Sequence, residues 1–128
     1  MPADTYDVIN RTVLTDNDRK ILTMLYQPII GAYAVNLFLT LWMDVDKNEF
    51  MSQEENHHHL LSSTGLSLNE IVVSREKLEA VGLLKTFYKE NEEENHYIYE
   101  LYSPLSAHEF LTHPVLNIVL YNSVGKKE

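Results

Sequence analysis

The sequence contains no cysteine among its 128 residues, and this absence excludes disulfide bonds and thiolate metal ligands. Glycine and proline are scarce, with 4 of each, whereas 45% of the residues are apolar. This composition predicts a single folded domain over residues 1–128 with one core. The N-terminus has neither the basic nor the apolar segment of a signal peptide, so we expect a cytoplasmic location.

Basic residues are also few, and the formal net charge is -9. An acidic surface repels a phosphate backbone, so dominant electrostatic DNA binding by this domain is disfavoured. Four residues that lie close in sequence are the candidate nucleic-acid contacts: Arg75, Lys77, Lys85 and Lys89. Four glutamates are concentrated within Glu90–Asn95. A solvated surface is the simplest interpretation of both clusters.

Charged residues are missing altogether from Ile21–Met43, a run as long as a membrane-spanning helix. Pro28 and Gly31 interrupt this run, and proline removes a helix hydrogen bond. The pattern therefore predicts two helices of a folded core. The first should stop at Pro28 and the second should run from about Ala32 to Asp44, apolar nearly all round.

The middle of the chain has the order of elements of a winged helix. A short helix over His57–Thr64 is predicted to end at Gly65, and a capping box at Ser67 opens a helix over Leu68–Val81. Two strands follow, over residues 84–89 and 96–102. Helix, turn, helix and hairpin together predict a winged helix over residues 57–102.

The remaining segments extend this unit at both ends. Residues 1–14 are predicted to be extended, and residues 103–124 to form a C-terminal helical extension. The polar segments 46–56 and 90–95 are predicted to be loops. The fold class is therefore mainly α with a small β-hairpin, a winged helix-turn-helix with added N-terminal and C-terminal helices. The chain stops at Glu128 for no evident reason, which favours a piece of a longer protein.

Catalytic and metal-binding patterns are weak. His57, His58 and His59 are adjacent, and successive helical residues point about 100° apart, so they are not expected to bind one metal ion. The sequence has no nucleophile elbow of the Gly-x-Ser-x-Gly type and no phosphate-binding loop. We therefore expect no catalytic residues, no metal, no cofactor, no small-molecule substrate and no enzyme activity.

Two binding functions remain. Leu68–Val81 would be a DNA-recognition helix, but three glutamates against two basic residues make it a poor phosphate contact. A winged-helix transcription regulator that binds duplex DNA is therefore the alternative. Excess apolar surface favours self-association, with a candidate oligomer interface at Phe38, Trp42, Leu116, Val119, Leu120 and Tyr121. These side chains could instead pack on one another within one chain.

Four segments resemble one known family: Leu25–Gly31 (LYQPIIG), Leu78–Leu84 (LEAVGLL), Ser103–Phe110 (SPLSAHEF) and Pro114–Tyr121. In order and spacing they are similar to the N-terminal domain of the DnaB/DnaD family of Gram-positive primosomal proteins. His113 stands where the family pattern has an aspartate, which removes that carboxylate as a helix cap.

This resemblance implies a self-associating winged helix, a dimer or tetramer, in a protein that helps to load the replicative helicase during replication initiation and restart. Implied partners are DnaD, the helicase loader ATPase and the replicative helicase. DNA binding, and membrane or nucleoid association, would come through the full-length protein.

Overall fold

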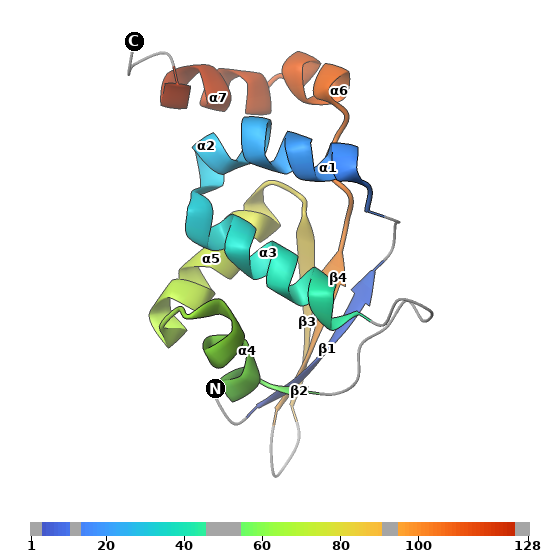
Figure 1. Ribbon diagram of the computed structural model, residues 1–128, viewed down its shortest axis with the longest axis vertical. Coiled ribbons are helices and arrows are strands. Elements are labelled where there is room, and N and C mark those ends of the chain that lie inside the picture. Colours follow the sequence, from blue (N-terminus) through green and yellow to red (C-terminus); the bar gives the residue numbers. More distant parts are fainter. Residues whose placement is uncertain (1–3, 11–13, 46–54, 91–94, 125–128) are drawn as a thin grey trace.

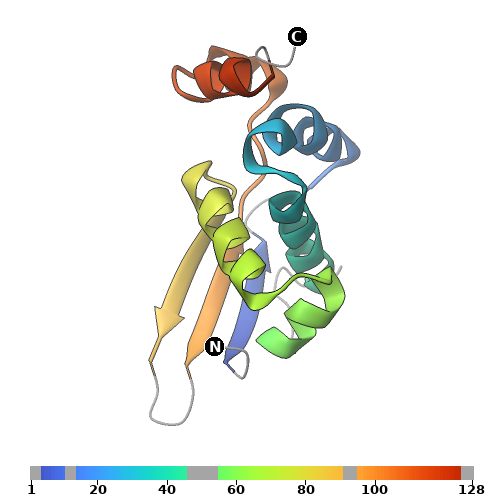
Figure 2. The same ribbon diagram turned by 90° about the vertical axis from the view of Figure 1, so that its left-hand side faces the viewer.

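A computed structural model describes residues 4–10, 14–45, 55–90 and 95–124. Most of the two predicted polar loops lies outside these residues. A four-stranded sheet forms one layer, and helices cover one of its faces (Figure 1; Figure 2). The strand order is β2-β1-β4-β3, with bounds β1 Thr5–Asn10, β2 Glu55–Asn56, β3 Leu84–Lys89 and β4 His96–Leu101.

The helical elements lie between and beyond these strands. A helical segment near the N-terminus leads into the long central helix, two helices precede the hairpin, and two more follow it. Their bounds are α1 Asp16–Ile21, η1 Leu22–Tyr26, α2 Gln27–Ile30, α3 Ala32–Asp44, α4 His57–Thr64, α5 Leu68–Ala80, α6 Ala107–Thr112 and α7 Leu116–Val124.

The winged helix predicted from the sequence is confirmed. Helix α4 ends at Gly65, which adopts a left-handed φ of 71°. Helix α5 begins with the capping box of Ser67 and Glu70, in which the Ser67 hydroxyl accepts from the Glu70 amide. Gly82, at φ 79°, closes α5, and the antiparallel pair β3–β4 follows directly. Local signals were sufficient here because each of them acts within a few residues.

The wing is larger than the predicted hairpin. Strand β1 pairs in parallel with β4 along its whole length, from Thr5 opposite His96 to Asn10 opposite Leu101. Strand β2 pairs with the outer edge of β1. The N-terminal segment is therefore an internal strand of the sheet, and only pairing between distant parts of the chain could place it there.

Pro28 does not stop the first helix, which is a correction to the sequence prediction. Helical backbone continues to Ile30 through the π-helical turn η1, in which the Gln27 amide donates to the Leu22 carbonyl. Proline clashes with the carbonyl four residues earlier in an α-helix, and the widened turn lies where that clash would occur. Gly31, at φ 87°, ends the segment.

The long helix α3 is the centre of the domain. It packs against α5, α4 and β1, so its apolar residues are buried on more than one side. Its polar residues are also used internally, because Asn36 donates to the carbonyl of Thr64 at 3.0 Å and accepts from Thr40. Within the described residues, no helix is long and apolar enough to cross a membrane.

Candidate protein-interaction surface

Arg75 does not lie on the outer surface of the would-be recognition helix. Only 20% of its side chain is exposed. It lines a small internal gap beside Tyr99, and its Nε lies 3.8 Å from Glu79 Oε1 in the next turn of α5. The candidate contact at Arg75 therefore faces the core and the sheet, where a DNA backbone cannot reach its whole guanidinium group.

The three candidate lysines are exposed but do not share one surface. Lys77 projects from α5, on the side of the sheet that the helices cover. Side chains alternate along β3, so the buried Leu84 faces the helices, whereas Lys85 and Lys89 face away from them. The Lys85 ammonium lies 5.7 Å from the ring centroid of Phe87 on the same strand.

Acidic side chains surround the remaining basic charge on α5. Glu76 and Glu79 are exposed, and the Glu70 carboxylate accepts from the Ser67 amide at 2.9 Å. One free lysine beside three glutamates is a poor match for a phosphate backbone. The geometry of α5 therefore offers little for duplex DNA.

The three adjacent histidines differ in burial: His57 is buried, His58 is exposed and His59 is half-buried. His57 is buried, with its Nδ1 2.7 Å from the Asp4 carbonyl oxygen and its Nε2 2.7 Å from the Tyr99 hydroxyl. The rings of Tyr6 and Tyr97 pack around it. Burial lowers the pKa of His57 below its usual value, because a charged imidazolium loses its hydration there.

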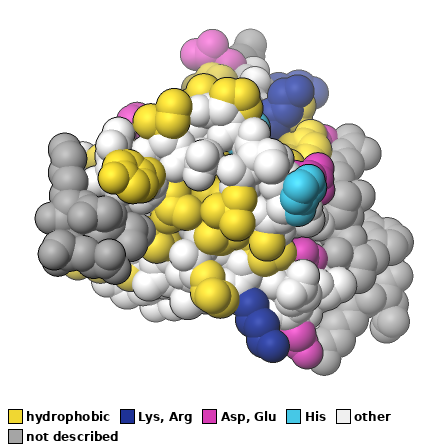
Figure 3. Space-filling model, turned by 90° about the horizontal axis from the view of Figure 1, so that it is seen from above, with side chains coloured by type: hydrophobic (Ala, Val, Ile, Leu, Met, Phe, Trp, Pro, Cys, Tyr) yellow, Lys and Arg dark blue, Asp and Glu magenta, His cyan; other side chains and the backbone are white. Residues whose placement is uncertain are grey.

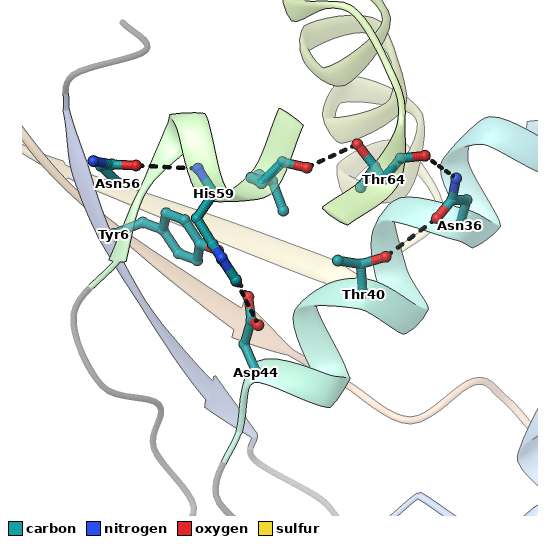
Figure 4. Close-up of polar contacts among 8 residues, drawn as sticks. Tyr6, Asn36, Thr40, Asp44, Asn56, His59 and Thr64 are labelled. Carbon is teal, nitrogen blue, oxygen red and sulfur yellow. Dashed lines mark hydrogen bonds and ion pairs between the residues drawn. The ribbon is translucent and has the colours of Figure 1, made fainter. Parts of the chain in front are cut away.

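A polar network around Asp44 ties α3 to the sheet and to α4 (Figure 4). The Tyr6 hydroxyl donates to Asp44 Oδ2 at 2.7 Å, and His59 Nε2 lies 3.2 Å from Asp44 Oδ1. Asn56 caps α4 by accepting from the His59 amide. His59 is thus engaged in a structural contact. The described residues hold no group of three side chains suited to a metal ion.

The C-terminal helices are attached to the first helical segment by an aromatic pair. Phe110 of α6 is fully buried, and its ring meets Tyr26 edge-on at a centroid distance of 4.8 Å. The Tyr26 hydroxyl also accepts from the amide of Leu105 at 3.0 Å. Burial raises the pKa of Tyr26, so this hydroxyl stays neutral. These contacts position α6 and α7 across one end of the molecule (Figure 1).

His113 caps the last helix, although it is not the aspartate of the family pattern. Its Nδ1 accepts from the amides of Val115 and Leu116, at 3.2 and 3.1 Å, and its carbonyl accepts from Asn117. Asparagine and aspartate oxygens make the same contacts at helix starts. Pro114, in the turn that leads into α7, has no N–H group and needs no partner for one. The imidazole thus replaces the expected carboxylate cap.

The outer side of α6 and α7 is apolar and exposed. We call this surface the α6–α7 apolar face; its residues, with their exposed fractions, are Leu111 (47%), Val115 (61%), Ile118 (60%) and Tyr121 (74%). Hydrophobic side chains gather in the middle of this end of the molecule, and charged ones lie mainly at its margins (Figure 3). Helix α7 carries no acidic residue in its first turn and no basic residue in its last. Such a face is typical of a protein-binding surface.

The candidate interface residues fall into three groups by burial, and the predictions for Phe38 and Leu116 need correction. Phe38 has no exposed surface and Leu116 is also buried, so both belong to the core of one chain. Trp42 and Leu120 are partly buried against that core, and Arg19 covers the Trp42 ring at 4.7 Å. Val119 is half-buried and Tyr121 is exposed.

The sequence reasoning missed Leu111, Val115 and Ile118 as members of the exposed face. Ile118 and Tyr121 lie three residues apart on one side of α7, and Val115 stands three residues before Ile118, directly ahead of the helix. This spacing is visible in the sequence, but α7 also has apolar residues on the side that faces the core. Which side faces outward depends on how the helix docks on α2, so sequence spacing alone could not decide it.

The order of elements and the sheet define a winged-helix domain with added helices before α4 and after β4. The chain belongs to the DnaB N-terminal winged helix domain family, whose model matches residues 1–128. It is 36% identical over 125 residues to the replicative helicase loading/DNA remodeling protein DnaB of Staphylococcus aureus (strain NCTC 8325 / PS 47). That match covers 96% of this chain and 26% of the relative, so the chain spans about a quarter of its length.

A solved structure shows the same fold. The crystal structure of primosome protein DnaB, residues 1–300, from Geobacillus stearothermophilus matches with a TM-score of 0.90 and 38% sequence identity. The match covers 99% of this chain and 48% of the crystallised chain. The family expected from the four sequence segments is therefore confirmed.

Proposed function

We propose that this domain is a self-association module of a replication-initiation protein that helps to load the replicative helicase. The family membership and the name of the Staphylococcus aureus relative support the setting. The observation that supports self-association is the α6–α7 apolar face. In this proposal the domain has no catalytic role, acts in the cytoplasm and works with other primosome proteins, the replicative helicase among them.

A second copy of the chain is the occupant that best fits the α6–α7 apolar face. Two copies related by a two-fold axis bury the same patch on each partner, so an apolar patch is matched by an equally apolar one. Helix α7 itself carries no charged residue that such burial would leave unpaired. Tyr121 adds an amphipathic ring, a residue type that is enriched in interfaces.

Sedimentation velocity at micromolar concentration tests this proposal. We expect the wild-type chain to be a dimer or a tetramer, and Ile118→Asp to be a monomer because it buries a carboxylate at the centre of the patch. Met43→Asp is the matched control, since Met43 is 72% exposed on α3 and outside the face. A monomeric wild type would contradict the proposal, and so would an Ile118→Asp variant that assembles to the same extent as Met43→Asp.

Duplex DNA binding by α5 is the second candidate function, and the acidic surroundings of Lys77 disfavour it. If the domain does read DNA, binding should be salt-sensitive and should weaken in Lys77→Ala and Arg75→Ala. Fluorescence anisotropy with a labelled duplex at low salt makes the comparison. Absence of binding at low salt removes this candidate, whereas the sedimentation result does not bear on it.

A further inference from the structure

The side of the sheet that faces away from the helices carries a surface that the proposed function does not use. Helices α3, α4 and α5 contact the sheet from one side (Figure 1; Figure 2), where the buried Leu84 and Tyr99 meet them. Side chains alternate along a strand, so the strand register assigns every second residue to the other side. We call that side the open sheet face; its residues form three rows across β3, β4 and β1, namely Lys85, Glu100 and Ile9; Phe87, Ile98 and Asp7; and Lys89, His96 and Thr5.

An apolar patch occupies the middle of the open sheet face. The Phe87 side chain is 44% exposed, and it lies directly across the strands from Ile98, which is half-buried. Ile9 is also half-buried, and it lies one row away from Ile98 on the neighbouring strand. The three side chains adjoin one another on three strands. Contiguous apolar side chains that water still reaches, with charged residues around them, are typical of a protein-binding surface.

The charges on the open sheet face are unequally matched within the chain. The Asp7 carboxylate lies 3.0 Å from His96 Nε2, and Glu100 is only 6% exposed. Lys85 and Lys89 are exposed, and in the part of the chain that the structure describes neither of them forms an ion pair. The accessible charge of this face is therefore positive and lies along β3, although the net charge of the chain is -9.

We propose that the open sheet face binds an amphipathic α-helix of a partner protein. The apolar side of this helix packs on Phe87 and Ile98, and its carboxylates pair with the two lysines of β3. The dimensions agree, because β1 and β3 flank β4 at a separation of about 10 Å, which is also about the diameter of a helix with its side chains. Helices on both faces of one sheet are a common layer arrangement.

The two lysines define the sequence pattern of the partner helix. Lys85 and Lys89 are four residues apart, which is about 13 Å along a strand. Helical residues that are seven positions apart lie on one side of the helix at a separation of about 10 Å, and the long lysine side chains span the difference. We therefore expect acidic residues at positions i and i+7, with apolar residues at i+3 and i+4. None of the described helices has two acidic residues seven positions apart, so a second copy of this chain does not supply the pattern.

Single-stranded DNA is the other polymer that basic and aromatic side chains attract, but it fits the open sheet face less well. Bases stack on aromatic rings, whereas the patch around Phe87 is aliphatic. Glu90 is exposed, and it is the first of four glutamates that follow Lys89 in the sequence. These carboxylates repel every phosphate of a backbone, whereas a helix can present a basic residue to them. The open sheet face shares no residue with the α6–α7 apolar face, so this proposal does not depend on self-association.

The test is an NMR titration of the ¹⁵N-labelled chain with two designed helical peptides. Both peptides carry leucine at positions i+3 and i+4, and they differ only at i and i+7, where one has glutamate and the other has lysine. We expect saturable binding of the glutamate peptide, with shifts at the amides of β3 and β4. The lysine peptide should bind roughly tenfold more weakly, because two attractive charge pairs become repulsive.

Reversing the charge of the two lysines gives the sharpest comparison. The variant that combines Lys85→Glu and Lys89→Glu should prefer the lysine peptide, a change of preference that a loss of folding cannot produce. Phe87→Ser should weaken binding of the glutamate peptide by roughly tenfold, because a central aromatic side chain is lost. Lys77→Gln and Tyr33→Ser are the matched controls, since both residues are exposed on helices, and both variants should bind as the wild type does.

Equal binding of the two peptides, no saturable binding of either, or an unchanged preference in the charge-reversed variant would overturn the proposal. Tighter binding of a short oligothymidylate at the same amides would also overturn it and would assign the open sheet face to single-stranded DNA. Loss of self-association in Phe87→Ser, measured by sedimentation velocity, would assign this face to a second copy of the chain instead. Amide spectra of each variant verify that it folds.

Discussion

Replacing His113 tests whether an imidazole caps the last helix. In His113→Ala the amides of Val115 and Leu116 lose the acceptor that now lies 3.2 and 3.1 Å away. Loss of one side-chain cap costs about 0.5–2 kcal/mol, and we expect about 1 kcal/mol here because both amides share one nitrogen. For a domain of this size that corresponds to a decrease in melting temperature of roughly 3–5 °C.

His113→Asp is the matched variant, because an aspartate oxygen reaches the same two amides and adds a charge that favours a helix N-terminus. We expect its stability to equal or exceed that of the wild type. Urea unfolding followed by circular dichroism measures the free energy of unfolding, and amide exchange in α7 reports whether the helix frays by itself. Equal losses in His113→Ala and His113→Asp would refute the capping role of the side chain.

Three further predictions concern the interior. Phe110→Ala should lower the free energy of unfolding by about 3–5 kcal/mol in urea titrations, because it empties a fully buried site against Tyr26; a loss no greater than that of Phe110→Leu would contradict this. Tyr26→Phe should cost about 1 kcal/mol by removing the acceptor of a backbone amide, and a neutral effect would argue against that hydrogen bond. Burial lowers the pKa of His57 in the folded state below its usual value of 6.5, so the folded state favours the neutral imidazole. The contribution of His57 to the stability of the fold is therefore complete above pH 6.5, and it is lost as the pH falls through the lower pKa of the folded state. Urea midpoints at pH 7.5 and 5.5 should therefore differ more in the wild type than in His57→Asn, and equal differences would exclude His57 as the cause.

The predicted winged helix rested on signals that act over one or two turns. Ser67 and Glu70 cap each other across three residues, and Gly65 and Gly82 supply the left-handed backbone that ends the two helices. Such interactions depend on neighbours in the chain, so they can be read from the order of residues. The same holds for the capping box at Ser106, whose hydroxyl accepts from the amide of Glu109.

The candidate site was harder to predict because exposure depends on docking. Phe38 and Ile118 are both apolar residues on apolar helices, yet one is fully buried and the other is 60% exposed. Helix α3 is enclosed by the sheet and two other helices, whereas α7 lies at one end and covers the core with one side only. Periodicity gives the direction of a side chain relative to its own helix and not relative to the rest of the molecule.

The sequence by itself determined most of the local elements of this protein, its acidic balance and, through four short segments, its family. Only the tertiary structure decided that the N-terminal strand lies inside the sheet, that His57 is buried against Tyr99, and that Arg75 faces inward. The physical reason is the range of the forces involved. The hydrogen bonds of caps and turns form between residues a few positions apart in the chain. Strand pairing, burial and exposure depend instead on how segments that are distant in the chain pack around one core.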